Sequence, residues 1–270
     1  MAEATAKALF DAAEAARAAV DADAKMALTE QAAALWRAAS ELEDGPLRAE
    51  ALADPGAPAK PELVDPRRVA KRNPGSGSGR AAHLHALTHI EFVATNLAWD
   101  AVVRFRGMPL AYYQQWAQVA LEEAEHFTAL RARLRDAGAD YGDFAAHNGL
   151  WDMAARTADD PLARMMMVPR YLEARALEAA PIMQAKFRQA GDEASAALIA
   201  RIAKEEIGHV AAGSRWFGHL CQSRGQDRRE AFVTLLDGFA RGRPKGPFEL
   251  DIRRQAGFTE WELAWLEQGG

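Results

Sequence analysis

Cysteine is almost absent from this 270-residue chain, in which Cys221 is the single example. One thiol excludes a disulfide framework and any zinc or iron–sulfur site built from several cysteines. No stretch has the roughly 18 apolar residues needed to cross a bilayer. The acidic residues within Met1–Val20 also exclude the apolar core of a secretory signal. We therefore expect a cytoplasmic protein without a membrane-spanning segment.

A strong excess of basic charge is also lacking. The formal net charge is -5, and the most basic stretch, Lys60–Arg80, is short. Nucleic-acid-binding domains usually carry a long basic patch or stripe. We therefore expect no nucleic-acid partner, although these data leave a contact with RNA open.

Alternating apolar and polar residues, the pattern of a half-buried strand, are missing throughout, and helix-forming residues dominate. The sequence therefore predicts an all-α protein. We expect helices over 3–42 with a break near Asp21, then over 80–105, 109–136, a short piece near Trp151, 160–191 with a kink at Pro181, 192–224, 226–240, and a last one after a capping box at Thr259.

Proline and glycine are concentrated in one interval, 45–79, which cannot sustain a helix or a central strand. This interval is predicted to be a long irregular connector that wraps the helices or covers something. We expect four regions: N-terminal helices at 1–44, the connector at 45–79, a four-helix bundle at 80–224 and a C-terminal helical extension at 225–270.

Two Glu-x-x-His phrases carry the chemistry: Glu123 with His126, and Glu206 with His209. Residues three apart lie on one helical face, so each pair can direct a carboxylate and an imidazole to the same point. Such donors suit iron, manganese or zinc. A single pair of this kind is a weak signal, because roughly 0.5 such pairs are expected by chance in a chain of this composition.

A repeat strengthens the signal. Glu91 lies 32 residues before Glu123, and Glu173 lies 33 before Glu206. The helix rise places Glu91 about 24 Å from the Gly107 turn and Glu123 about 21 Å beyond it, at a similar height on the returning helix. All four glutamates interrupt apolar stripes, and burying them together requires cations. Two divalent ions would neutralise four carboxylates.

Several stretches resemble a bacterial ferritin-like family of unassigned function that is distantly related to a tRNA-modifying di-iron hydroxylase. They are Thr88–Glu91, Leu97–Asp100, Glu122–Phe127, Tyr171–Arg175, Glu205–His209, and Lys245–Phe248 with Arg253–Gly257. The resemblance runs from about Pro58 to the C-terminus and implies a ferritin-like four-helix bundle. In that class, each of two helices gives a Glu and each of the other two gives a Glu-x-x-His. The resemblance thus assigns the metal-ligand roles to Glu91, Glu123, His126, Glu173, Glu206 and His209.

Neighbouring residues have more ordinary interpretations. We expect Glu122, Glu125 and Glu205 on the surface. Glu173 rather than Glu178 is expected to be the ligand, because Glu178 breaks the repeat and would at most support a ligand imidazole. Packing roles are expected for a further set, although redox or pocket roles stay open for some of its members: His83, His85, His89, Tyr112, Tyr113, Trp116, Met165–Met167 and Cys221.

Two carboxylate-held ions with open positions can bind dioxygen. The leading prediction is therefore a di-iron oxidase or hydroxylase with dioxygen as cosubstrate, a separate electron donor, and an unknown small-molecule or modified-nucleoside substrate. Iron is the first candidate for both metals, with manganese or a mixed Fe/Mn pair as alternatives. A ferroxidase or storage protein, a dimanganese enzyme that disproportionates peroxide, and a non-catalytic helical module remain open.

Overall fold

The computed structural model describes residues 5–42, 54–70, 77–240 and 244–268. These residues are helical or irregular apart from single bridge residues, of which Leu63 and Ala146 pair with each other. The prediction of an all-α protein is confirmed. No helix among the described residues is both long and apolar enough to cross a membrane. The chain divides into two compact units, 1–151 and 152–270, which are described separately below.

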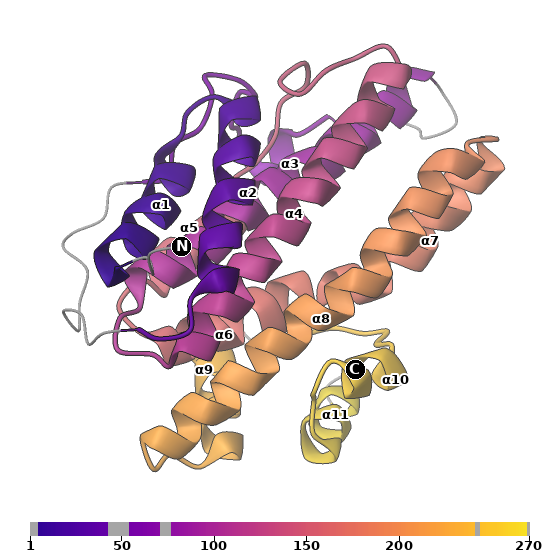
Figure 1. Ribbon diagram of the computed structural model, residues 1–270. Coiled ribbons are helices and arrows are strands. Elements are labelled where there is room, and N and C mark those ends of the chain that lie inside the picture. Colours follow the sequence, from indigo (N-terminus) through magenta and orange to yellow (C-terminus); the bar gives the residue numbers. More distant parts are fainter. Residues whose placement is uncertain (1–4, 43–53, 71–76, 241–243, 269–270) are drawn as a thin grey trace. The chain divides into compact units, whose positions relative to one another are not determined.

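A long helical hairpin forms the centre of the first unit (Figure 1). The helices of the first unit are α1 (Ala6–Ala18), α2 (Ala22–Ala38), α3 (Gly77–Arg104), α4 (Leu110–Asp136) and the start of α5 (Gly149–Arg156). The boundary between the two units lies within α5. The hairpin is α3–α4; α1 packs on α3, and α2 packs on α4. Because several neighbours cover α3, it is buried on most faces and lacks a clear amphipathic stripe.

The turns of the first unit follow the sequence closely. The break predicted near Asp21 separates α1 from α2, and the Asp21 carboxylate caps α2 by accepting from the Ala24 N–H at 2.8 Å. Gly107 has a φ of 74° in the α3–α4 turn, a conformation that favours glycine. Tyr113 also fixes this turn, because its hydroxyl donates to the Phe105 carbonyl and accepts from the Met108 N–H.

The second unit is built on a second hairpin, α7–α8, whose helices lie side by side in Figure 1. Its elements are α6 (Pro161–Met167), the π-helical turn η2 (Val168–Glu173), α7 (Arg175–Gln189), α8 (Glu193–Ser223), α9 (Arg228–Phe239), α10 (Leu250–Gln255) and α11 (Glu260–Glu267). Both α6 and η2 pack against α8. The predicted capping box is present, with Thr259 and Glu262 capping α11.

One helix prediction needs correction. The segment 160–191 was expected as one helix with a kink at Pro181, but the interruption falls at η2. Pro169 has no N–H to donate, and the chain widens so that the Ala174 N–H bonds to the Pro169 carbonyl five residues back. Pro181 lies inside α7.

The predicted connector is only partly visible. Residues 54–70 are irregular apart from η1 (Pro66–Arg68), α3 begins at Gly77 rather than Arg80, and the rest of 45–79 lies outside the described residues. The short helix α10 was not predicted. The four-region division of the chain stays a prediction, and the two hairpins of its expected bundle belong to different units.

Candidate metal centre

The α3–α4 hairpin brings three predicted ligands together inside the first unit. Glu91 from α3 meets Glu123 and His126 from α4, and one ligand atom of each lies within 4.8 Å of the others. His126 Nδ1 is 3.5 Å from Glu123 Oε2 and 3.8 Å from Glu91 Oε2. The predicted return of the chain to the same height is therefore observed in this hairpin.

All three side chains are buried, with Glu91 6%, Glu123 1% and His126 1% exposed. Phe92 and Phe127, on the same two helices, pack against each other with ring centroids 5.7 Å apart. This apolar packing limits the access of water to the hairpin, and buried carboxylates in such a setting need compensating positive charge.

The electrostatics of the cluster favour a cation. Burial by itself lowers the pKa of His126, but the Glu123 and Glu91 carboxylates outweigh burial and raise that pKa to about 11. Even with His126 protonated, two ionised carboxylates leave the cluster with one net negative charge. A divalent metal ion bound by a neutral imidazole would remove that charge. The donor set therefore fits a metal ion, and this buried cluster can hold one.

The second unit holds the other predicted Glu-x-x-His pair. Glu206 and His209 lie on one face of α8, with His209 Nδ1 3.4 Å from Glu206 Oε1, and both are buried. Glu173 is the last residue of η2, which packs against α8, and its side chain is half-buried. The assignment of all six ligands to one centre stays a prediction.

Glu178, the competitor of Glu173, has a different partner. Its carboxylate accepts two hydrogen bonds from the buried Arg253 guanidinium, at 2.7 and 2.9 Å. An arginine held in this bidentate way neutralises Glu178. Among the acids expected on the surface, Glu125 is exposed, whereas Glu122 and Glu205 are half-buried.

The histidines near the start of α3 have structural partners. His85 Nε2 accepts from the Gly142 N–H, and His89 contacts the Tyr141 hydroxyl and the His147 carbonyl. Burial lowers the pKa of His85 to about 4, so its imidazole is neutral near pH 7. The packing interpretation is confirmed for His85 and His89. Tyr141, which stacks on both rings, was not anticipated because it lies in a loop without periodicity.

Packing roles are also observed for most of the other residues with open alternatives, whereas Met166 is buried and also lines a cavity of the second unit. Tyr112 and Tyr113 are buried, and their hydroxyls donate to backbone carbonyls of Ala101 and Phe105. Trp116, Met165–Met167 and Cys221 are buried as well.

The second unit contains a charged pair that the sequence analysis missed. Arg170 of η2 and Glu262 of α11 are buried, and they form an ion pair of 2.9 Å. The pair is separated by more than ninety residues, so no helical spacing connects its members. The capping box that placed Glu262 at the start of α11 was the single available signal, and it did not reveal the arginine.

The fold and the cluster define an all-helical protein with a buried carboxylate and imidazole site that can hold a metal ion. The chain belongs to the DUF455 family of proteins of unknown function, whose model matches residues 18–264. It is 44% identical over 216 residues to an uncharacterised protein of Haemophilus influenzae, which covers 77% of this chain and 75% of that protein. No solved structure gives a significant match. The predicted membership of a family without an assigned function is confirmed.

Proposed function

We propose that this protein is a ferritin-like dinuclear metal enzyme, with an oxidase or hydroxylase activity that uses dioxygen. The metals are two divalent ions, iron before manganese. A bound di-iron pair supplies the two-electron reduction of dioxygen that oxidation of a C–H bond requires. The proposed substrate is a small molecule or modified nucleoside. The nucleoside is proposed from the resemblance to a tRNA-modifying hydroxylase alone, and that relationship is itself part of this proposal.

The buried cluster of Glu91, Glu123 and His126 carries the proposal. Two carboxylates and one imidazole match the charge of one divalent ion, as argued above. Glu173, Glu206 and His209 repeat that donor set at nearly the same spacing in the second unit. Two equal donor sets support one ion for each unit, and we propose that both serve one dinuclear centre.

The protein side chains have separate tasks in this proposal. The four carboxylates bind the ions and cancel their charge, while His126 and His209 each donate one ring nitrogen. Both histidines must then be neutral, so metal binding displaces the proton that the carboxylates hold on His126 in the metal-free state. Phe92 and Phe127, which pack against each other between α3 and α4, would help to keep water out of this hairpin.

Metal counting after anaerobic reconstitution with iron(II) tests the proposal. We expect about two irons per chain, and a transient optical signal on exposure to air. Glu123→Gln should remove at least half of the metal because a neutral amide replaces a charged ligand. Glu125→Gln is the matched control, since Glu125 is exposed on the same helix, two residues away. Circular dichroism checks that both variants fold.

The second unit is tested by Glu206→Gln in the same assay. Loss of both irons in each of Glu123→Gln and Glu206→Gln supports a shared centre, whereas loss of one iron in each would mean two separate sites and would overturn the dinuclear part. An intact wild-type protein without bound metal would overturn the proposal. The dinuclear part would be overturned if the wild type bound one iron per chain and Glu206→Gln left that number unchanged. Rapid release of dioxygen from peroxide by the manganese form would overturn the oxidase activity in favour of peroxide disproportionation. Comparing RNA nucleosides and metabolites of deletion and wild-type cells then tests the substrate.

A further inference from the structure

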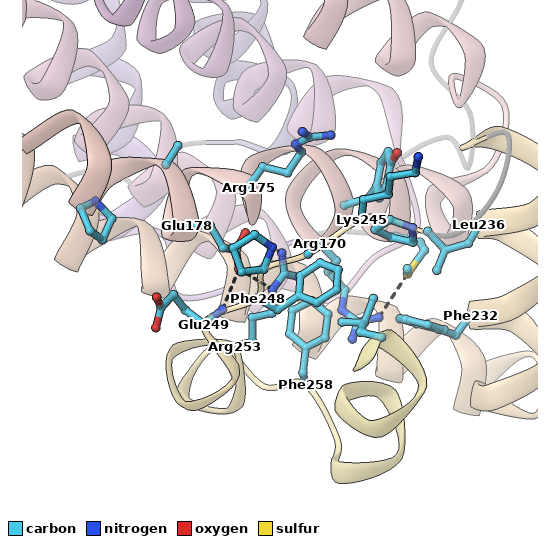
Figure 2. A pocket seen from close by; sticks show the side chains of 18 of the residues that line it. Arg170, Arg175, Glu178, Phe232, Leu236, Lys245, Phe248, Glu249, Arg253 and Phe258 are labelled. Carbon is cyan, nitrogen blue, oxygen red and sulfur yellow. Dashed lines mark hydrogen bonds and ion pairs between the residues drawn. The ribbon is translucent and has the colours of Figure 1, made fainter. Parts of the chain in front are cut away.

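The second unit encloses a cavity of about 470 Å³ that none of the six predicted ligands lines. Its walls come from η2, α7, α9, α10, α11 and the segment 244–249 (Figure 2). This volume lies within the range of pockets that bind small organic molecules. The cavity is therefore large enough for a ligand of its own.

Two walls of the cavity contain buried arginines held in fixed positions. Glu178 holds Arg253 through two hydrogen bonds, and Glu262 pairs with Arg170. Aromatic rings also pack on both guanidinium groups: Arg253 lies 5.1 Å from the ring centroid of Phe258, and Arg170 lies 4.5 Å from the same centroid. These contacts place positive charge at the cavity wall without requiring a ligand to order it.

Two further cations line the cavity, Arg175 and Lys245, and both are exposed. Among the described residues, no carboxylate lies within ion-pair distance of either. Figure 2 shows both residues above the cluster of Phe248, Arg253 and Phe258 in that view. The lining as a whole has four cationic side chains, whereas Glu178 and Glu249 are its two carboxylates. Glu262, behind the lining, already matches Arg170, so the net positive charge of the cavity comes from Arg175 and Lys245 and is partly offset by Glu249.

The remaining lining is mostly apolar and includes several aromatic rings: Tyr171, Phe232, Phe248 and Phe258. Aromatic walls favour flat apolar groups, which can stack on a ring or meet its edge. A free inorganic anion would use the cations but leave these rings unused. A ligand that combines an anionic group with a flat apolar body uses both parts of the lining.

We propose that this cavity binds a small organic anion with a phosphate or carboxylate group and a planar apolar body. Arg175 and Lys245 contact the anionic group, because their charges are not already matched by carboxylates among the described residues. The planar body lies against Phe248 and its aromatic neighbours. This site does not depend on the proposed metal centre, because its lining includes none of the six ligands.

Calorimetric titration of the metal-free full chain with phenyl phosphate tests the proposal, with benzoate as the carboxylate arm. We expect saturable binding of at least one of them, and much weaker binding of phenol, which is flat but neutral at pH 7. The double variant Arg175→Gln/Lys245→Gln should weaken that binding at least tenfold, since it removes both charge-assisted contacts. Arg201→Gln is the control, because Arg201 is exposed on α8 outside the cavity lining.

Phe248→Ala separates the planar body from the anionic group. It should weaken binding of phenyl phosphate or benzoate and leave inorganic phosphate unaffected. Absence of binding at millimolar concentration would overturn the proposal. Equal losses in Arg201→Gln and in the double variant would also overturn it, because binding would then reflect total charge. Inorganic phosphate that binds as tightly as phenyl phosphate would overturn the planar part.

Discussion

Glu262→Gln tests how the C-terminal extension holds η2 in place. Glu262 of α11 is 1% exposed, and its carboxylate lies 2.9 Å from the fully buried Arg170 side chain of η2. Glutamine keeps the size of the side chain and can still cap α11 through its carbonyl oxygen. The substitution therefore removes the charge that faces Arg170, and it also removes one of the two carboxylate oxygens that accept from Arg228.

The expected cost follows from the surroundings of Arg170. Burial lowers the pKa of Arg170 to about 10 even though Glu262 raises it, so the removal of Glu262 leaves a buried guanidinium whose charge has lost its main compensation. Ser214 Oγ, at 3.0 Å, and three aromatic rings remain as neighbours, and none of them carries negative charge. Breaking a buried pair from one side typically costs about 3–5 kcal/mol. Because these neighbours remain, we expect the free energy of unfolding to fall by about 3 kcal/mol, the lower end of that range.

Urea unfolding followed by circular dichroism measures this loss in the free energy of unfolding. Glu260→Gln is the control, because the Glu260–Arg254 pair in the same unit has a similar distance of 2.6 Å but both side chains are exposed. We expect no measurable change for that variant. Replacing both buried partners, in Arg170→Met/Glu262→Leu, should recover the part of the loss that comes from the uncompensated guanidinium, while the losses of the Arg228 contact and of the α11 cap remain. Equal effects of Glu262→Gln and Glu260→Gln would refute the argument.

The pair also predicts a dependence on pH. Burial raises the pKa of Glu262, but Arg170 and Arg228 outweigh it and lower that pKa below its usual value of 4.5. A lowered carboxyl pKa contributes stability above the unfolded-state pKa, and the contribution is lost as the pH falls through the folded-state pKa. The difference between wild type and Glu262→Gln should therefore shrink below about pH 4.5.

Two further predictions concern other parts of the chain. Gly213→Ala should destabilise the second unit by about 1–3 kcal/mol in urea unfolding, because the new Cβ would lie 2.5 Å from Cγ of the rigid Pro169 ring. Gly208→Ala is the control and should be neutral or slightly stabilising, since its Cβ would lie in open space. Equal effects of the two substitutions would contradict the contact between Gly213 and Pro169. Between pH 6.5 and about 4 the wild type should lose about 3 kcal/mol of stability through His85, because the lowered pKa of His85 makes the unfolded chain bind the proton first. His85→Gln should remove this loss. Unchanged acid unfolding of the variant would show that His85 does not accept from Gly142 as a neutral imidazole.

Much of the fold could be predicted because its signals are local. Asp21, Asp160 and Asp192 each cap a helix where the sequence placed its start, and the Thr259 capping box begins α11. Each cap depends on a side chain bonding to a backbone group two or three residues away, so a short stretch of sequence contains the whole interaction. The turn at η2 could not be located in this way, because two prolines, Pro169 and Pro181, offered the same local signal.

In the candidate site, too, contacts set by local helix geometry could be predicted and long-range contacts could not. Glu91, Glu123 and His126 were predicted together because a hairpin with equal arms joins positions that helix geometry relates directly. The partners of Arg170 and Arg253 were missed because Glu262 and Glu178 lie 92 and 75 residues away along the chain, respectively, with no regular element linking them. Long-range charge pairs depend on how α10 and α11 pack, which no periodicity in the sequence specifies.

The position of η2 has a physical explanation that joins these observations. A proline in a helix interior removes one backbone hydrogen bond, and the turn is widened at Pro169 although α7 continues through Pro181. An inserted residue rotates everything after it by about 100°. Glu173 ends this widened turn, so Pro169 sets the direction of the predicted ligand. Gly213 lets α8 approach the Pro169 ring, and Glu262 neutralises Arg170 in the same turn. A π-helical turn held from two sides is expected where a side chain must point in one direction, which supports Glu173 over Glu178 as the ligand.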